Sequence, residues 1–385
     1  MSGKAKSIQI ITETRPLGPV VSAVVVEYNE KIKTEQVYPS MYEVKANRLN
    51  EFGGDLGNRN ITRVYTNNSP VQTEKPTPGK YVIIELYTQD PNALILYHKE
   101  IEEGGFNYFY DLEYTILQKE NIESSEGNII AAGVISGGER VDPVADKFKN
   151  SIHKNHKKEL PYGLALPDNY DPEKEYPLVL YLHGAGERGN NNLVNIPANK
   201  GSILWAEDSL QVEHPCFVLA PQCPTDSSWT GILADGGPFE PTVHLEMVHE
   251  LLMELLNEYS IDKNRLYCTG LSMGGFGTWA LNISHPETFS AMVPICGGGD
   301  PEQAELLADK PIWNFHAEDD AVVDVSYSRD MVNALKNVGS NVIYTEYDKG
   351  IVSPPLAPFP HFAWVPVYNN KKMIEWLFTQ EKKSK

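Results

Sequence analysis

Apolar runs alternate with amphipathic stretches in the second part of the chain, and this alternation restricts the fold more than any other feature. The apolar runs occupy residues 177–184, 216–222, 265–270, 289–298, 311–317 and 341–347. The stretches with helical periodicity occupy residues 244–259, 274–285, 326–338 and 371–380. Buried strands that alternate with helices are typical of a mostly parallel sheet covered by helices on both faces. We therefore expect an α/β domain over residues 161–385, with ligands bound at the carboxyl ends of its strands.

Residues 1–137 show a different pattern, in which β-branched and alternating segments occur without helical periodicity. These segments lie at residues 7–14, 20–29, 37–46, 61–67, 80–88, 93–98 and 109–118, and turn-rich pieces such as 50–60 and 67–80 separate them. About seven short strands in such a length predict an all-β sandwich of immunoglobulin-like character. Residues 138–160 are polar and lack strand alternation, and we predict that they form a linker.

Composition restricts the partners of the chain. The formal net charge of −19 disfavours nucleic acid and anionic lipid as partners. No apolar run is long enough to span a membrane, and the first residues lack the apolar stretch of a signal peptide. The chain as written is therefore expected in the cytoplasm, with secretion as the alternative if a signal peptide has been removed.

The cysteines show no metal-binding spacing. The four of them are Cys216, Cys223, Cys268 and Cys296, and none forms a CxxC pair. We expect buried thiols, no metal site and no cofactor. The spacing leaves a disulfide between Cys216 and Cys223 open.

A candidate nucleophile lies between an expected strand and an expected helix. Residues 270–274 read Gly-Leu-Ser-Met-Gly, which fits the pattern G-x-S-x-G. A strand before the pattern and a helix after it form the setting that a nucleophile elbow requires. The N-terminus of the helix would stabilise a developing oxyanion. A chance match in a glycine-rich turn is the alternative, but the flanking elements favour Ser272 as the nucleophile.

A serine nucleophile needs a general base, usually histidine, and a carboxylate that orients it. In this fold the chain order is serine, acid, histidine. Only three of the ten histidines follow the serine, namely His285, His316 and His361. His285 lies at the end of the helix behind the nucleophile, and His316 comes too early in the order. We therefore predict His361 as the base.

The acid is expected in the loop after the strand at 311–317, where Asp319, Asp320 and Asp324 are the candidates. The unselected carboxylates are expected to be solvated or to cap local structure.

Residues 183–189 read HGAGERG and follow the first strong strand. In this fold the oxyanion hole combines one backbone N–H from this loop with that of the residue after the nucleophile. We assign Ala185 and Met273, with Gly184 as the second choice in the loop. A phosphate-binding loop is the alternative, but the segment lacks both G-x-G-x-x-G and the GK[ST] ending. The predicted substrate-binding residues are Gly184, Gln222, Trp229 and Trp279.

Five motifs occur in one order: LHGAGERG, APQCPTDSSW, GLSMGGFGTW, FHAEDDAVV and HFAW. Together they resemble the polyhydroxybutyrate-depolymerase and feruloyl-esterase branch of the α/β-hydrolases, and in particular two-domain bacterial esterases with an immunoglobulin-like domain ahead of the hydrolase domain. The resemblance covers about residues 160–380. It implies hydrolysis of short- to medium-chain esters without cofactor or metal, and it selects Asp320 as the acid beside Ser272 and His361.

Two features depart from the family pattern. Ala317 stands where the family often has glycine, and a long proline-rich segment over residues 349–360 precedes His361. That segment is a candidate to shape or partly cover the pocket.

Other functions use the same residues. A serine peptidase or amidase of the prolyl-oligopeptidase type would use the same triad, but those enzymes carry a larger propeller, and no repeat of about 40–50 residues is present. A feruloyl or acetyl esterase acting on plant polysaccharide is a further alternative. The N-terminal domain is a candidate for binding a polymer or for forming a homo-oligomer. The expected partner is a small-molecule or polymer-linked ester.

Overall fold

The computed structural model describes residues 5–48, 54–101, 104–155, 157–231 and 239–382. Contacts within the chain divide it into two units. The first contains residues 1–97 and 108–146, and the second contains residues 98–107 and 147–385. Each unit is described separately.

The first unit contains two mostly antiparallel sheets around one apolar core. The five-stranded sheet has the order β13-β1-β2-β6-β5, and the four-stranded sheet has the order β12-β9-β3-β4. The strands are β1 (Ala5–Arg15), β2 (Gly18–Ile32), β3 (Tyr42–Arg48), β4 (Gly54–Arg59), β5 (Ile61–Asn67), β6 (Gly79–Leu86), β9 (Leu112–Gln118), β12 (Gly133–Gly137) and β13 (Glu139–Val141). Val24 and Ile84 of one sheet share a buried cluster with Val44 and Ile116 of the other. This packing of two sheets confirms the predicted immunoglobulin-like sandwich.

Smaller elements complete the N-terminal half of the chain. They are the 3₁₀ turns η1 (Thr34–Gln36) and η2 (Pro39–Met41), the strand pair β10 (Ile122–Glu123) and β11 (Ile129–Ile130), and the strand pair β7 (Leu96–Ile101) and β8 (Gly104–Phe109). Within β7 and β8 the chain passes from the first unit to the second and back, so residues 98–107 belong to the second unit.

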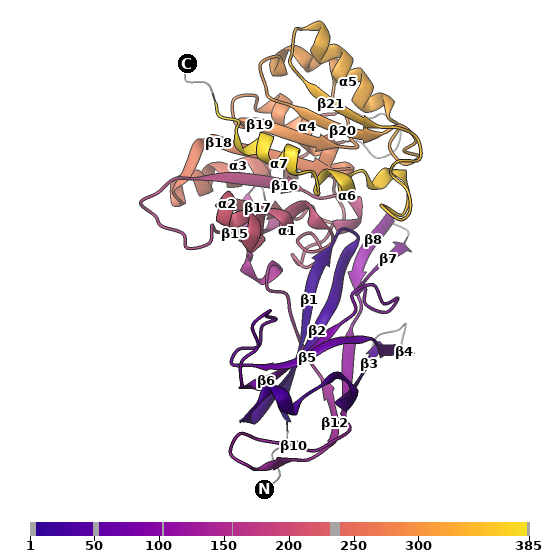
Figure 1. The fold of residues 1–385 in the computed structure, drawn as a ribbon. Coiled ribbons are helices and arrows are strands. Elements are labelled where there is room, and N and C mark those ends of the chain that lie inside the picture. Colours follow the sequence, from indigo (N-terminus) through magenta and orange to yellow (C-terminus); the bar gives the residue numbers. More distant parts are fainter. Residues whose placement is uncertain (1–4, 49–53, 102–103, 156, 232–238, 383–385) are drawn as a thin grey trace. The chain divides into compact units, whose positions relative to one another are not determined.

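The second unit is built on an eight-stranded sheet with the order β14-β15-β17-β16-β18-β19-β20-β21 (Figure 1). The strands are β14 (Lys149–Asn155), β15 (Lys158–Ala165), β16 (Tyr176–Leu182), β17 (Phe217–Pro221), β18 (Ile261–Leu271), β19 (Ala291–Ile295), β20 (Trp313–Ala317) and β21 (Ile343–Tyr347). The six strands from β17 to β21 in this order run parallel, and β14 and β15 are antiparallel. The carboxyl ends of β16, β18 and β20 therefore meet at one edge of the sheet.

Helices cover both faces of this sheet. They are α1 (Lys200–Ala206), α2 (Asp208–Glu213), α3 (Val243–Glu258), α4 (Met273–Ser284), α5 (Ser326–Asn337), α6 (Trp364–Val367) and α7 (Lys371–Phe378). The 3₁₀ turns in this half are η3 (Ala145–Lys147), η4 (Ala185–Glu187), η5 (Pro301–Leu307) and η6 (Pro360–Phe362). Leu178, Leu180 and Leu182 of β16 pack with residues of α3, α4 and α5. Tyr181 points to the opposite face and packs edge-on against Tyr368 at the end of α6. Burial on both faces explains why this strand is uniformly apolar.

The segment 138–160, which we predicted as a linker, contains regular strands. It holds β13, which pairs with β1, and β14, which pairs with β15. The C-terminal part of the second unit accordingly begins at residue 147, and residues 98–107 belong to the same unit, whereas we predicted a domain that begins at 161. Both strands lie at sheet edges and six of the seven residues of β14 are exposed, so the segment has the polar composition of a loop.

The cysteines and helices bear on two further expectations. All four cysteines are buried free thiols, which confirms the predicted burial and gives no disulfide between Cys216 and Cys223. Within the described ranges, no helix is both long enough and apolar enough to cross a membrane.

Candidate active site

Ser272 occupies a sharp turn between β18, which ends at Leu271, and α4, which begins at Met273. Its backbone has φ 53° and ψ −121°, a conformation that a residue with a side chain rarely adopts. Such strain persists only where the surrounding structure enforces it. The turn leaves the hydroxyl at the carboxyl end of the strand, where the helix N-terminus begins.

Two glycines are required by the close packing of this turn. A Cβ atom on Gly270 would lie 2.3 Å from the carbonyl oxygen of Gly274, and a Cβ atom on Gly274 would lie 1.9 Å from the carbonyl oxygen of Leu182. Both distances are far below van der Waals contact, so no larger residue fits without movement of the backbone. The G-x-S-x-G pattern is therefore a steric requirement of this strand–turn–helix arrangement.

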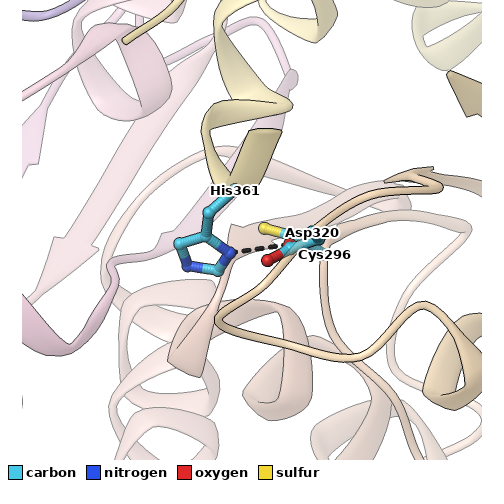
Figure 2. A group of neighbouring side chains, drawn as sticks. All are labelled: Cys296, Asp320 and His361. Carbon is cyan, nitrogen blue, oxygen red and sulfur yellow. Dashed lines mark hydrogen bonds and ion pairs between the residues drawn. The ribbon is translucent and has the colours of Figure 1, made fainter. Parts of the chain in front are cut away.

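The structure brings the three predicted residues into one hydrogen-bonded chain. His361 Nε2 lies 2.9 Å from Ser272 Oγ, and His361 Nδ1 lies 2.7 Å from Asp320 Oδ2. Figure 2 shows the imidazole of His361 directed toward the carboxylate of Asp320. An ionised carboxylate only accepts hydrogen bonds, so Nδ1 carries a proton and, in the neutral ring, Nε2 is free to accept the serine proton.

Asp320 is held in place by several donors. Its Oδ1 accepts the backbone N–H groups of Val322 and Val323 at 2.9 and 3.0 Å, and His316 Nε2 lies 3.3 Å from Oδ2. Burial by itself would raise the pKa of this carboxyl, but hydrogen bonds from His316 and His361 bring the pKa of Asp320 well below its usual range. The carboxylate is therefore ionised at neutral pH.

The rival acids have other partners. Asp319 Oδ2 accepts the backbone N–H of Gly350, and Asp324 Oδ1 accepts the backbone N–H of Ser326 at the start of α5. Both carboxylates are thus engaged with the backbone, as we expected for the unselected acids, and the structure places Asp320 alone of the three against His361.

The two other histidines that follow Ser272 also have other contacts. His285 Nε2 lies 2.8 Å from a carboxylate oxygen of Glu246. His316 is buried, and its Nε2 lies 3.0 Å from the carbonyl oxygen of Val323. A carbonyl only accepts, so this nitrogen carries a proton that also faces Asp320. Sequence order set His316 aside as a base, and its place behind the carboxylate was not anticipated.

Cys296 is a neighbour that the sequence did not connect with the site. It follows β19 with φ 41°, and Figure 2 shows its thiol beside Asp320. Its sulfur, an oxygen of Asp320 and a nitrogen of His361 lie within 4.8 Å of one another, close enough to count as possible metal ligands. Burial raises the pKa of the Cys296 thiol, and the other two groups already share a hydrogen bond.

The loop after β16 lies beside the nucleophile. A Cβ atom on Gly184 would come within 3.7 Å of the Cβ atom of Ser272. A Cβ atom on Gly184 would also lie 3.1 Å from Glu187 Oε2, so the Glu187 carboxyl packs against this glycine. Ala185 is the first residue of η4 and Met273 is the first residue of α4, so both backbone N–H groups lie at the start of a helical turn.

Three predicted substrate-binding residues have no exposed surface. Gln222, Trp229 and Trp279 are each fully buried. The amide of Gln222 donates to the backbone carbonyl of Glu187 at 3.0 Å, and the indole of Trp229 donates to that of His183 at 3.0 Å. These two contacts tie the loops together, and the burial of all three side chains gives them a packing role in this structure.

Comparisons with known proteins follow the division of the chain. Residues 7–131 match the family model of the Esterase Ig-like N-terminal domain, and residues 154–341 match the Esterase family model. A crystal structure of a thermostable esterase is 40% identical, covers 98% of this chain and 100% of that chain, and superimposes with a TM-score of 0.91. The likeness therefore extends over both units.

Curated relatives match a shorter part of the chain. Probable feruloyl esterase C of Aspergillus oryzae is 26% identical over 150 residues, which are 39% of this chain and 50% of that protein. Poly(3-hydroxybutyrate) depolymerase of Ralstonia pickettii is 26% identical over 125 residues, which are 31% of this chain and 25% of that protein. The match thus spans half or less of the length of these two relatives.

Proposed function

The chain belongs to the esterases that carry an immunoglobulin-like N-terminal domain, and we propose that it hydrolyses carboxylic esters through an acyl-enzyme formed on Ser272. The observation that carries this proposal is the hydrogen-bonded chain from Ser272 through His361 to Asp320 at a strained elbow. A hydroxyl, an imidazole and an ionised carboxylate in this order are the parts that acyl transfer requires.

The first step is attack on the ester carbonyl. Ser272 Oγ bonds to the carbonyl carbon while His361 Nε2 takes the hydroxyl proton. The Asp320 carboxylate stabilises the imidazolium that forms, because its oxygen already accepts the Nδ1 proton.

The negative charge that develops on the substrate oxygen is met by the backbone N–H groups of Ala185 and Met273. Met273 is the first residue of α4, so its N–H and the positive end of the helix dipole point in the same direction. Donors that are in place before the reaction need no reorganisation as the charge appears.

His361 then protonates the leaving alcohol, which departs and leaves the acyl group on Ser272. Water attacks the acyl-enzyme with His361 as general base, and the acid product leaves with regeneration of the serine hydroxyl.

The proposed substrates are short- to medium-chain esters, free or linked to a polymer. The names of the fungal and bacterial relatives support aromatic esters and polyester as candidate substrates. Phe359 and Trp364 flank the base, with ring centroids 6.4 and 5.3 Å from that of His361. Phe359 is exposed and suits contact with an apolar acyl or alcohol group.

A panel of p-nitrophenyl esters from acetyl to long acyl tests this proposal, with methyl ferulate and a matched p-nitroanilide in parallel. We expect turnover of short esters, a fall in kcat/KM as the acyl chain lengthens, and turnover of the anilide lower by several orders of magnitude. Absence of turnover for every ester, or anilide turnover equal to ester turnover, would contradict the proposal and favour a peptidase or amidase.

Assembly is a separate proposal. We propose a homo-oligomer formed through the N-terminal domain, and light scattering on the full chain tests it.

A further inference from the structure

The described residues 98–101 of β7 and 104–107 of β8, called the hairpin tip below, belong to the same unit as the nucleophile. They group with residues 147–385, although in sequence they lie among strands of the first unit. Phe106 and Asn107 of β8 contact Arg188 and Glu187, respectively. The function proposed above assigns no role to these contacts.

Asn107 makes a short hydrogen bond to a buried carboxyl. Its Nδ2 donates to Glu187 Oε1 at 2.6 Å. Glu187 is a buried acidic residue, which is uncommon without a partner. A Cβ atom on Gly186 would lie 2.8 Å from the same Nδ2, so the loop has a glycine where the amide approaches. The close fit indicates a specific contact between the hairpin tip and the loop.

The carboxyl of Glu187 connects this contact with the nucleophile. A Cβ atom on Gly184 would lie 3.1 Å from Glu187 Oε2, so the carboxyl packs directly against the backbone of Gly184. A Cβ atom on Gly184 would also lie 3.7 Å from the Cβ atom of Ser272, so this glycine is close to the nucleophile. In the chain, Gly184 directly precedes Ala185, the proposed oxyanion donor. The orientation of the Ala185 N–H therefore depends on how the Glu187 carboxyl is held.

A second contact from the hairpin acts on the same loop. The guanidinium of Arg188 lies over the ring of Phe106, 4.7 Å from its centroid. Arg188 Nε donates to the carbonyl oxygen of Ala185 at 2.9 Å, and Nη1 donates to that of Thr225 at 3.2 Å. The hairpin tip thus contacts the side chains of Glu187 and Arg188, which both follow Ala185 in this loop.

We propose that Asn107 is a positioning residue for the oxyanion hole, because its hydrogen bond to Glu187 holds the loop of residues 184–188 with the Ala185 N–H directed at the reacting carbonyl. The inference rests on the proposed function, since it assumes ester attack by Ser272. Asn107 touches neither the nucleophile nor the base, so it acts through Glu187.

The orientation of the amide follows from its two neighbours. Asn107 Oδ1 lies 2.9 Å from His98 Nδ1, and His98 Nε2 lies 3.1 Å from a carboxylate oxygen of Glu100. Because Asn107 Nδ2 donates to the Glu187 carboxyl, the amide oxygen is the atom that faces His98 Nδ1, and it can only accept from that nitrogen. In the variant N107D, a second carboxyl would face that of Glu187. The other charged or titratable groups around these two carboxyls are His98, Glu100 and Arg188.

The test compares N107A and N107D with N155A and N155D in the full chain. Asn155 donates to Glu250 at 2.7 Å in the same unit, on β14 at the far edge of the sheet, so it is a matched amide–carboxylate pair remote from Ser272. For hydrolysis of p-nitrophenyl acetate, we expect N107A to lower kcat by about 10- to 100-fold with KM changed less than about threefold. The Asn155 variants are expected to stay within about twofold of wild type.

A transition-state analogue separates positioning from general damage to the fold. A methyl trifluoromethyl ketone forms an oxyanion on Ser272, and its inhibition constant should rise in N107A by about the same factor as kcat falls, while the inhibition constant of acetate stays unchanged. An N107A kcat within twofold of wild type, or a change confined to KM, would overturn the proposal.

The pH dependence of N107D keeps the proposal testable if N107A does not fold. At low pH one shared proton restores a hydrogen bond between residues 107 and 187, and at high pH two carboxylates repel each other. The ratio of N107D to wild-type kcat should therefore rise as the pH falls, and a ratio independent of pH would overturn the proposal. Wild type and S272A are measured alongside. Wild type without esterase activity, or S272A as active as wild type, would show that the proposed function itself has failed.

Discussion

Replacement of Asp320 by asparagine tests the role of the carboxylate without a change in shape. Oδ1 accepts two backbone N–H groups, from Val322 and Val323. An amide nitrogen at that position would face two backbone donors, whereas at the position of Oδ2 it faces one fixed donor, His316 Nε2, because His361 can change its tautomer. The amide oxygen of the variant therefore takes the position of Oδ1, and the NH₂ group takes that of Oδ2, 2.7 Å from His361 Nδ1. It can only donate, which removes the proton from Nδ1 and places it on Nε2.

In that tautomer His361 cannot accept the proton of Ser272. We therefore expect D320N to lower kcat for p-nitrophenyl acetate by about 10⁴-fold, the loss known for the equivalent change in a serine protease. At about 1.4 kcal/mol for each factor of ten, this is about 5.5 kcal/mol of transition-state stabilisation. The KM should change much less, because Asp320 is buried behind the imidazole and does not contact substrate.

Steady-state kinetics at pH 7.5 measure the effect, with D319N and D324N as matched controls. Each control removes a carboxylate of the same loop that has no contact with His361, and each should keep kcat within about threefold of wild type. A loss below tenfold in D320N, or an equal loss in D319N or D324N, would refute the assignment of the acid and the tautomer argument with it.

Three further predictions concern stability and the thiols. G274A should lower the free energy of unfolding in urea by about 3 kcal/mol or more, because its Cβ atom would lie 1.9 Å from the carbonyl oxygen of Leu182. G133A, where a Cβ atom meets nothing within 4 Å, should leave it within about 1 kcal/mol, and equal losses would contradict the steric argument. Because the pKa of Asp320 is lowered in the folded protein, its contribution to stability is present above the unfolded value of about 3.9 and is lost as the pH falls below it. Urea unfolding between pH 6 and pH 3 should show a smaller loss of stability in D320N than in wild type, and equal losses would contradict this. Burial raises the pKa of all four thiols, so dithionitrobenzoate should label them only after unfolding, and rapid labelling of the native protein would contradict this.

Hydrophobic patterning was sufficient to predict the parallel core of the second unit. Each of the six parallel strands overlaps an apolar run, and in β16, β17 and β19 every residue is buried, so water-facing polar residues do not interrupt the pattern there. The edge strands β13 and β14 were missed for the opposite reason, since water covers most of their side chains. The strand β4 lies in the glycine-rich segment 50–60, which was predicted as turns.

In the site, too, residues within a local sequence pattern could be predicted, whereas contacts between distant segments of the chain could not. Ser272 and His361 were identified from a local turn pattern and from chain order, and the structure places them 2.9 Å apart. The side chains of Gln222 and Trp229 were predicted to bind substrate, but both are buried. The sequence indicates which loop a residue belongs to, but not in which direction its side chain points. Asn107 was out of reach, since it lies 80 residues before Glu187 and in a segment with the pattern of another domain.

The proposed acyl-enzyme on Ser272 can be tested most directly by covalent labelling with a fluorophosphonate, followed by intact-mass and peptide mass spectrometry. We expect one label per chain on Ser272, loss of esterase activity in proportion to labelling, and no label on S272A. A label on a different residue, or full esterase activity in S272A, would show that Ser272 is not the nucleophile.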